Sequence, residues 1–315
     1  MIARAPGKLV LSGAYSVLEG APAIVAAVDR YAVADGARAA DFVADEVRAA
    51  VALGFMDRPV WFDASALREP VPGGQSRKLG LGSSAAILAA SLAAARGDRF
   101  ADEAALREAI FPQALVAHRK AQGGGSGVDV AASVYGGVLR VVLAAGGALE
   151  VSPAPLPAGT VVEVYASPVS ASTRDLLGRV RALGERDPAR HRACLDAAGE
   201  GARRAAAAGS IAALVSAVRA QTDALGALGE ASGAPIVTPE VAALRAPAEA
   251  LGGTFAPSGA GGGDIAFFLG SAPTPEAFRA LAVAHGLARV ALTVGAAGAG
   301  HVPAGSVPVG EGLRG

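Results

Sequence analysis

Runs of apolar residues with alternating or helical spacing divide the chain into expected strands and helices. Strict alternation predicts half-buried strands, and longer runs with apolar positions three and four residues apart predict helices. In the first half the expected strands cover 8–11, 23–33, 60–63 and 136–144, and the expected helices cover 39–53, 85–95 and 102–122. Acidic residues open the last of these helices and basic residues close it, which suits the helix dipole.

The second half carries longer helical stretches. A strand at 161–166 precedes helices expected at 173–183, 191–208, 211–228 and 239–251, and the chain closes with strand 253–256, loop 258–263, strand 265–269, helix 275–285 and strand 288–294. Between the halves, residues 146–159 are rich in proline and glycine, which is typical of a domain boundary. We therefore expect two domains, 1–150 and 151–315.

A glycine turn with two hydroxyls opens directly onto an apolar helix at residues 78–86, which we name the glycine cradle. Glycines let a backbone approach a ligand closely, and the first turn of a helix presents unpaired N–H groups at its positive end. The cradle is therefore expected to bind a phosphate. Ser83 or Ser84 can cap the helix or reach a Mg²⁺ held by phosphates. Alone, such a segment is more typical of a plain glycine turn with an N-cap.

Two further glycine-rich segments strengthen the phosphate interpretation. In the aspartate loop, residues 121–133, a run of glycines delivers Asp129 to the start of a helical turn, where N–H groups and the dipole should keep it ionised. Asp129 could accept a proton or orient a hydroxyl, although capping is the usual role of such a residue. The glycine loop, residues 257–264, lies between two strands, and three successive glycines exceed what a plain hairpin needs.

Composition narrows the class of protein. The chain has 315 residues, 52% of them hydrophobic, and a formal net charge of +0, which gives no electrostatic case for binding nucleic acid or an anionic membrane. Its single cysteine, Cys194, excludes an intrachain disulfide. The N-terminus lacks the apolar region of a secretory signal, and no uninterrupted apolar run reaches the roughly 20 residues of a membrane span. We expect a cytoplasmic enzyme.

The histidines do not add a metal site to this picture. Their spacing does not match that of metal ligands, and each is interpreted as a surface or helix-end residue. The four histidines are His118, His191, His285 and His301.

Phosphoryl transfer needs a phosphate site, a cation near the transferred group and a carboxylate near the acceptor hydroxyl. The cradle, Lys8 or Lys78, and Asp129 supply candidates for all three. The P-loop pattern is absent. Residues 80–85 also fit a loose dinucleotide fingerprint, but the preceding residues are too polar for the buried strand that a Rossmann site requires.

Three segments resemble the motifs of the GHMP kinase superfamily, in the same order: Pro6-Gly7-Lys8, residues 80–86 and residues 258–263. The resemblance covers nearly the whole chain. It implies an α+β fold with two domains, the first like domain 2 of ribosomal protein S5 and the second ferredoxin-like. It further implies ATP and Mg²⁺ as cofactors, with ATP along the cradle and a small-molecule acceptor between the domains.

Several other segments are similar to the phosphomevalonate kinase branch of this superfamily. They are residues 61–67, His118 with 121–122, residues 125–132, residues 170–173 and the Asp264 ending of the glycine loop. The resemblance implies phosphorylation of (R)-5-phosphomevalonate to the diphosphate, a step of isoprenoid precursor synthesis by the mevalonate pathway, in a monomer or homodimer.

The same resemblance implies roles for individual residues. Asp129 and Lys8 are the catalytic pair, and Ser84, or less favourably Ser83, contacts Mg²⁺ or phosphate. The residues implied in nucleotide binding are Lys78, Gly80, Leu81, Gly82, Ser83, Ser84 and Ala85. Those implied in substrate binding are Lys8, Ser12, Tyr15, Ser126, Gly127, Asp129, Ser170, Ser172, Thr173, Ser258, Gly259 and Ala260.

Three positions depart from the pattern of that branch: Ala14, Tyr165 and Ala256 stand where glutamate, tryptophan and lysine are common. The acceptor is thus less firmly indicated than the chemistry. Mevalonate kinase, or another small-molecule kinase of the superfamily, is the enzymatic alternative. A catalytically silent nucleotide-binding regulator is the alternative outside enzymes, although Asp129 and Lys8 are both present.

Overall fold

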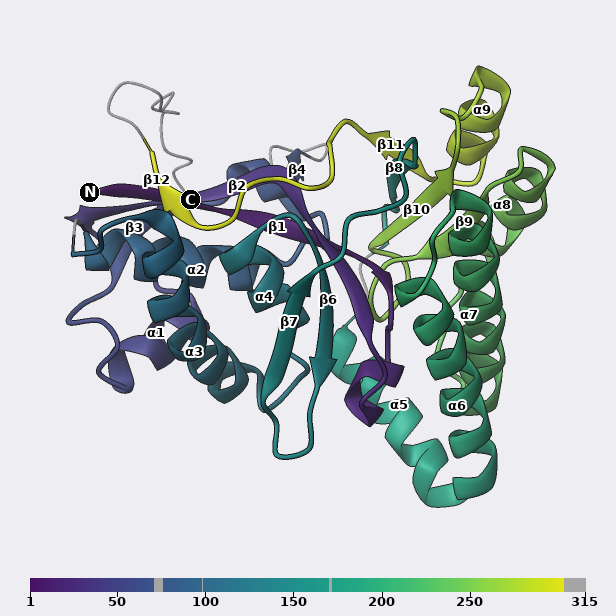
Figure 1. Ribbon diagram of the computed structural model, residues 1–315, viewed down its shortest axis with the longest axis horizontal. Helices are drawn as coiled ribbons and strands as arrows, with labels where there is room; N and C mark the ends of the chain where they lie inside the picture. Colours follow the sequence, from purple (N-terminus) through teal and green to yellow (C-terminus); the bar gives the residue numbers. More distant parts are fainter. Residues whose placement is uncertain (71–75, 98, 170–171, 303–315) are drawn as a thin grey trace.

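Two antiparallel sheets with their own helices form the two halves of the protein, which lie side by side in Figure 1. The structure is a computed structural model and describes residues 1–70, 76–97, 99–169 and 172–302. Mixed sheet and helix in separate layers confirm the expected α+β class.

The first half is built on a six-stranded sheet in the order β12-β1-β2-β6-β7, with β3 also paired to β2. Its strands are β1 (Ile2–Ser12), β2 (Ala23–Ala39), β3 (Val60–Asp63), β6 (Val138–Leu143), β7 (Leu149–Pro153) and β12 (Gly300–His301). Its helices are α1 (Asp45–Ala52), α2 (Ser83–Arg96), α3 (Glu103–Gln122) and α4 (Val128–Tyr135), with short turns η1 (Ser16–Glu19) and η2 (Ser65–Leu67). A separate hairpin joins β4 (Arg68–Pro70) to β5 (Ser76–Lys78).

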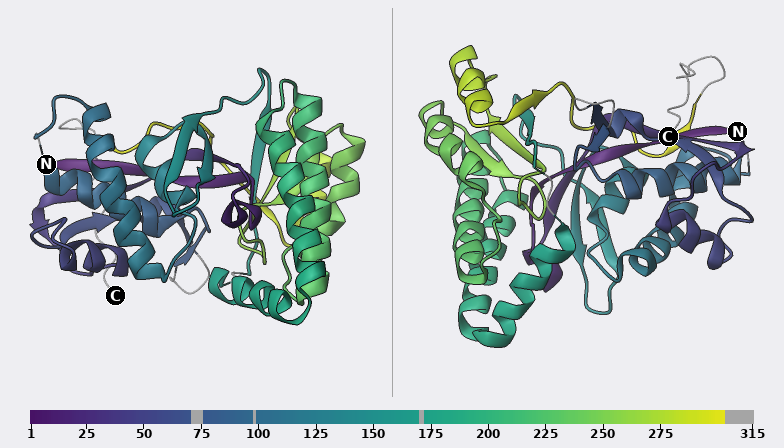
Figure 2. Two further views of the ribbon diagram at one scale, coloured as in Figure 1. Left: turned by 60° about the horizontal axis from the view of Figure 1, so that its bottom comes forward. Right: turned by 180° about the vertical axis from the view of Figure 1, so that it is seen from behind.

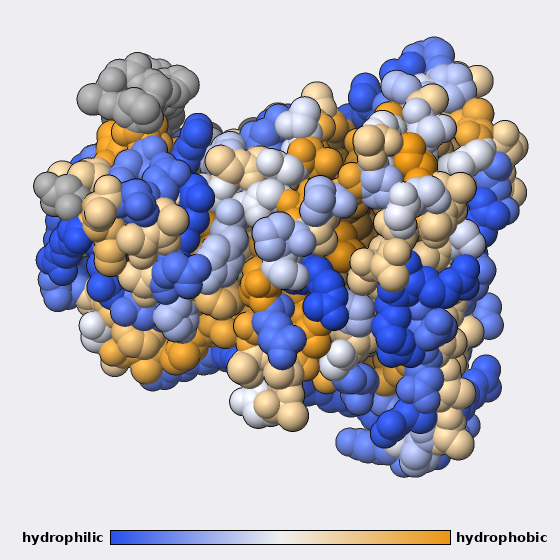
Figure 3. Space-filling model, viewed as in Figure 1, coloured by the Kyte–Doolittle hydropathy of each residue, from blue (hydrophilic) through white to orange (hydrophobic). Residues whose placement is uncertain are grey.

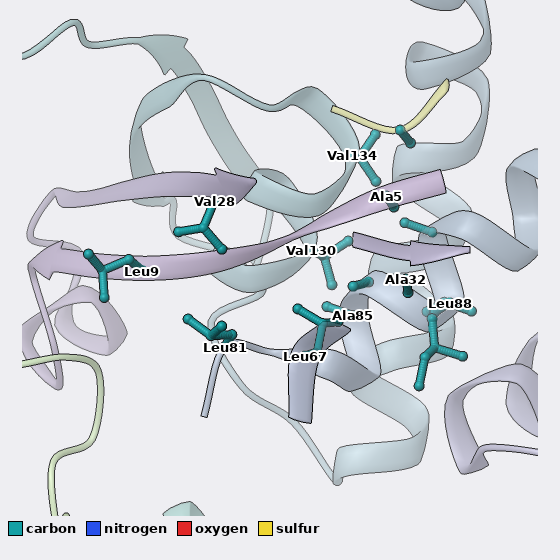
Figure 4. Packing of buried hydrophobic residues seen from close by; sticks show 14 of the residues in the cluster. Ala5, Leu9, Val28, Ala32, Leu67, Leu81, Ala85, Leu88, Val130 and Val134 are labelled. Carbon is teal, nitrogen blue, oxygen red and sulfur yellow. The ribbon is translucent and has the colours of Figure 1, made fainter. Parts of the chain in front are cut away.

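Helix α2 is the central helix of this half because almost every side chain on it is apolar and small. Ten of its residues are buried, and a helix that is apolar all round belongs inside a core. Figure 4 shows how the core forms beneath β1: Leu9 on the strand faces Leu81 and Leu67, and Ala85 at the start of α2 lies beside them. The cradle is thus anchored on both sides by buried apolar contacts.

The second half is a four-stranded sheet in the order β11-β8-β10-β9, covered by helices on both faces. Its strands are β8 (Val161–Ala166), β9 (Thr254–Pro257), β10 (Ile265–Gly270) and β11 (Ala288–Val290). Its helices are α5 (Thr173–Arg186), α6 (Pro188–Ala206), α7 (Ile211–Ser232), α8 (Pro239–Ala250) and α9 (Glu276–Ala284).

Strand β10 is buried along its whole length because its two sets of alternating side chains enter different cores. Phe267 and Leu269 pack in the large core that also contains residues of α7, whereas Phe268 packs with residues of α8 and α9. Alternation in a strand places successive side chains on opposite faces. The large core continues from the first half into the second, so the two sheets share one apolar interior.

The chain returns to the first sheet after β11. In Figures 1 and 2 this last segment runs from the second half back beside the N-terminus. Val294 bridges to Val28, Ala297 bridges to Gly136, and β12 pairs with β1. The division at residue 150 stays a prediction, but the first sheet contains strands from both sides of that position.

Three expectations about local structure were wrong. The helix expected from residue 39 begins only at Asp45, because β2 continues to Ala39. The region 146–159 is not wholly a linker, since β7 pairs there with β6. The strand expected over 288–294 ends at Val290, where the chain leaves the second sheet.

Among the described helices, α7 alone is long and apolar enough to cross a bilayer by length and composition. Its Leu214, Val215 and Val218 lie in the large core. Figure 3 shows polar side chains over much of the outer surface, with apolar ones gathered along the middle of this face. Burial in the core accounts for the apolar composition of α7.

The segment that returns to the first sheet after β11 contacts the backbone closely at Gly298. A substitution there tests how much this segment contributes to stability. A Cβ at Gly298 would lie 2.3 Å from the carbonyl oxygen of Val134. We expect Gly298→Ala to lower the free energy of unfolding by about 1–3 kcal/mol, because the clash is with backbone. Gly178→Ala is the matched control: that glycine lies exposed within α5 with open space around it, and alanine there should stabilise by roughly 0.5–1 kcal/mol. Urea unfolding of both variants measures the difference, and equal stabilities would contradict the prediction.

Candidate functional site

The segments that resemble the three motifs meet on strand β1. The Lys8 backbone N–H donates to the carbonyl oxygen of Leu81 at 2.8 Å, and the Val10 N–H donates to the Ser258 hydroxyl at 2.9 Å. The Lys8 ammonium also donates to the carbonyl oxygen of Gly80 at 3.3 Å. One strand therefore contacts both the glycine cradle and the glycine loop.

The cradle glycines make room for two charged side chains. A Cβ at Gly82 would lie 2.9 Å from Cγ of Lys8, and a Cβ at Gly80 would lie 2.7 Å from Cβ of Asp264. Both glycines also have a positive φ, of 73° and 72°. The sequence explained these glycines by the approach of a ligand, but in the structure they are first required by Lys8 and Asp264.

Neither cradle serine caps helix α2, so that expectation was wrong. Gly82 occupies the N-cap position in the left-handed conformation, without a capping side chain. Ser83 and Ser84 instead lie in the first turn, where the backbone N–H groups have no partner within the helix. Among the described residues, neither hydroxyl makes a side-chain hydrogen bond. The first turn of α2 thus presents N–H groups and two hydroxyls together.

Asp129 is not a helix cap either. Gly127 is the N-cap of α4, and Asp129 lies in the first turn with its Oδ1 accepting from the Val130 N–H at 3.0 Å. Its Oδ2 lies 3.2 Å from Nε2 of His118 on α3. Burial raises the pKa of Asp129. His118, then Lys8 and the Val130 N–H, together lower the pKa by more than burial raises it, so that the net value is about 2. The carboxylate is ionised, as expected, and His118 contributes most to keeping it so.

His118 is a buried residue rather than a surface residue, which corrects the sequence interpretation. Only 6% of its surface is exposed, and its Nδ1 has no hydrogen-bond partner among the described residues. Burial lowers the pKa of His118, but the carboxylates of Asp129 and Glu46 raise it more, so the net shift is upward. Glu46 on α1 is itself 4% exposed and accepts a hydrogen bond from Gln122.

Five ionisable groups therefore follow one another with alternating sign, from the glycine loop of the second half into the first half. We name this series the charge chain: Asp264, Lys8, Asp129, His118 and Glu46. Burial lowers the pKa of Lys8, and the carboxylates of Asp129 and Asp264 offset only part of that effect. The sequence pointed to Lys8 and Asp129 but missed the roles of the other three members.

Tyr15 joins β1 to the glycine loop. Its hydroxyl donates to the carbonyl oxygen of Ala260 at 2.7 Å, and burial raises its pKa. The backbone of Tyr15 has φ 61° and ψ −54°, with the Ser16 N–H donating to the Ala14 carbonyl, which is the rare and strained form of a γ-turn. Strain of this kind persists only where the surroundings hold it in place, and it clusters at functional sites.

The other residues that the resemblance implied in substrate binding differ in accessibility. Ser12 is 3% exposed, with a hydroxyl that lacks a partner among the described groups. The carbonyl of Ser126 accepts from Arg119, and Gly127 packs against Leu115. Gly259 lies next to the Lys8 ammonium, since a Cβ there would be 3.8 Å from Nζ.

Lys78 and the turn at 170–173 are not joined to Lys8 or Asp129 by a hydrogen bond or ion pair among the described residues. Lys78 is exposed on β5 opposite Arg68. Ser172 caps α5 by accepting from the Asp175 N–H, Thr173 is exposed, and Ser170 lies outside the described residues. Ser167, three residues before that turn, lies beside the glycine loop, because its N–H donates to the carbonyl of Asp264 at 3.1 Å.

Two of the three departures from the branch pattern are core positions. Tyr165 is fully buried and hydrogen-bonded to Thr274, and Ala256 is 2% exposed within β9. Ala14 packs at the edge of the small cluster around Tyr15.

A groove of about 1020 Å³ along β6, β7 and residues 153–160 contains none of the implied site residues.

Known proteins resemble this chain in sequence. The family description of the GHMP kinases N terminal domain matches residues 47–137. A curated phosphomevalonate kinase from Streptomyces sp. (strain CL190) is 29% identical over 85% of this chain and 89% of its own length.

Solved structures share the fold. The phosphomevalonate kinase of Streptococcus pneumoniae, in complex with phosphomevalonate and AMPPNP, has a TM-score of 0.74 at 18% identity, covering 93% of this chain and 99% of that one. The mevalonate kinase of L. major has a TM-score of 0.64 at 18% identity, covering 90% of each chain. The chain is thus similar to the GHMP kinases over residues 47–137 and to phosphomevalonate kinase over most of its length.

Proposed function

We propose that this kinase transfers the γ-phosphoryl group of ATP to (R)-5-phosphomevalonate, giving the 5-diphosphate. The observation that carries the proposal is the pairing of Lys8 and Asp129 beside the first turn of α2, where unpaired N–H groups and two hydroxyls are available to phosphates. The similarity to a curated phosphomevalonate kinase supports the acceptor. ATP as donor is supported by the match of residues 47–137 to the GHMP kinases N terminal domain.

In the proposed mechanism, Lys8 and Asp129 hold the reacting oxygens. The Lys8 ammonium lies between the acceptor oxygen and the transferring phosphoryl, and stabilises negative charge there. Asp129 accepts a hydrogen bond from the acceptor hydroxyl and orients its oxygen for in-line attack. Its pKa of about 2 makes it a weak base, so it takes the proton late, as the bond to phosphorus forms. A loose transition state requires little more, because positioning and electrostatics supply most of the acceleration.

The residues of the cradle fit a magnesium ion held mainly by the nucleotide. The Ser84 hydroxyl is not used for capping, and a hydroxyl with phosphate oxygens suits Mg²⁺, which keeps few protein ligands in such sites. No group of three His, Cys, Asp or Glu side chains that could hold a metal ion occurs among the residues that the structure describes. Mg²⁺ would neutralise phosphate charge in the complex.

The remaining assignments are also proposals. We propose that Ser172 and Thr173, together with Ser170, which lies outside the described residues, bind the acceptor phosphate, with Lys78 as a further cation. We further propose a cytoplasmic enzyme, a monomer or homodimer, without nucleic-acid or membrane partners. Its neutral net charge supports this picture.

The acceptor is tested by offering the purified protein ATP and Mg²⁺ with phosphomevalonate, mevalonate, homoserine or galactose. We expect turnover with phosphomevalonate, measured as ADP release and as diphosphate product. Turnover of mevalonate instead would establish the runner-up activity. Failure on all four alcohols, with ATP still bound, would favour the silent regulator.

Asp129→Asn tests the catalytic pair. We expect kcat to fall by on the order of 10²-fold or more, because the amide cannot take the proton, while ATP affinity stays within about twofold. Stopped assays for kcat and calorimetry for ATP binding separate the two effects. Asp196→Asn, an exposed change on α6, is the matched control and should keep full activity. A fully active Asp129→Asn variant would remove Asp129 from the mechanism.

The pH dependence of kcat/KM tests Lys8. Its ammonium form is required, and burial lowers its pKa, so activity should fall as the pH rises through that lowered value. Asp264 raises the pKa of Lys8, so Asp264→Asn should move the basic limb of the profile to lower pH. Profiles of this variant, the wild type and Asp196→Asn make the comparison. A basic limb that does not move in Asp264→Asn would contradict the assignment of that limb to Lys8.

A further inference from the structure

His118 is a buried polar residue that the proposed mechanism does not use. It lies on the inner face of α3, in line with Leu106, Ile110 and Ala114 at successive turns, where an apolar side chain would be expected. Its Nε2 faces Oδ2 of Asp129 across 3.2 Å, and its Nδ1 has no partner among the described residues. A half-paired imidazole is costly in a core, so its retention there calls for an explanation beyond packing.

We propose that His118 is a positioning residue for Asp129, which holds Oδ2 through its Nε2–H and fixes the direction in which the carboxylate presents its free lone pairs. The proposal rests on the proposed function, because it assumes that Asp129 binds the acceptor hydroxyl. His118 acts through Asp129 and need not touch the substrate.

The geometry of the carboxylate supports this role. A carboxylate has about four lone-pair directions. The Val130 N–H occupies one at Oδ1, and His118 occupies one at Oδ2, so the plane of the group is fixed from two sides. With 21% of the Asp129 side chain exposed, the remaining directions are open to a ligand near Lys8. Without His118 the carboxylate could rotate about its side-chain torsions, and a reacting hydroxyl would lose its alignment.

The charges around His118 favour its protonated form. Asp129 faces it from α4 and Glu46 from α1, while Arg119 on its own helix opposes the charge. Lys8 lies beyond Asp129 on β1. The imidazolium thus separates two carboxylates that would otherwise repel each other, and it offsets the upward shift that burial gives the pKa of Asp129.

Two substitutions separate orientation from charge. His118→Gln keeps an N–H donor but is neutral, and His118→Leu removes both the donor and the charge at similar volume. We expect His118→Leu to lower kcat by on the order of 10- to 100-fold, as for other partners that orient a reacting group, with the KM for ATP within about twofold. His118→Gln should recover a substantial part of that loss. His191→Gln on α6 is the matched control and should behave as the wild type.

The acid limb of kcat/KM distinguishes positioning from a merely structural role. Without the imidazolium, the pKa of Asp129 rises from about 2, so the acid limb should move to higher pH in both His118 variants. A variant that is only destabilised would lose activity without moving the limb. Loss of kcat in His118→Leu without a shift of the acid limb, or without recovery in His118→Gln, would overturn the proposal.

A measurement that does not depend on turnover distinguishes failure of the His118–Asp129 pairing from failure of the proposed function. The imidazole carbon and nitrogen shifts of His118, followed by NMR against pH, report its protonation in the wild type and in Asp129→Asn. We expect its titration to move to lower pH in Asp129→Asn, because the opposing carboxylate is gone. An unmoved titration would overturn the pairing itself. A moved titration with a fully active Asp129→Asn would support the pairing while removing the proposed function.

Discussion

The partial burial of the Lys8 ammonium is the constraint on which the site depends. An ammonium taken out of water is tolerated only beside opposite charge and hydrogen-bond acceptors. Here the opposite charges come from α4 and from the glycine loop, and the acceptor is the carbonyl of Gly80. Asp129 and the cradle belong to the first half and Asp264 to the second, so Lys8 gains its full set of partners only when the two halves have folded together.

The cradle glycines follow from the same constraint. A side chain at Gly82 would collide with the stem of Lys8, and one at Gly80 would displace Asp264. The positive φ at both positions then turns the backbone so that α2 points its first turn into the site. Packing of Lys8 and presentation of N–H groups are therefore achieved by the same residues.

Much of the fold was predictable from apolar periodicity. Strand β8 and the start of α7 were predicted at their observed residues, because a run of β-branched and aromatic residues marks the first and a serine cap marks the second. The end of β2 and strand β7 were not, since their pairing depends on distant partners rather than on local pattern. His118 had a signal: it falls on the buried face of α3 at the spacing of Leu106, Ile110 and Ala114, but only the structure shows that Asp129 lies opposite.

The return of the chain to the first sheet makes the two halves interdependent. The Val302 N–H donates to the carbonyl of Ile2 at 3.0 Å, so the first and last described segments are stitched into one sheet edge. A fragment ending near the middle of the chain would lack the segment that covers β1, and the complementary fragment would carry that segment with nothing to pair against. The two halves therefore depend on each other. A circular permutation that places new termini in a surface turn should be tolerated better than a division into two separately expressed halves.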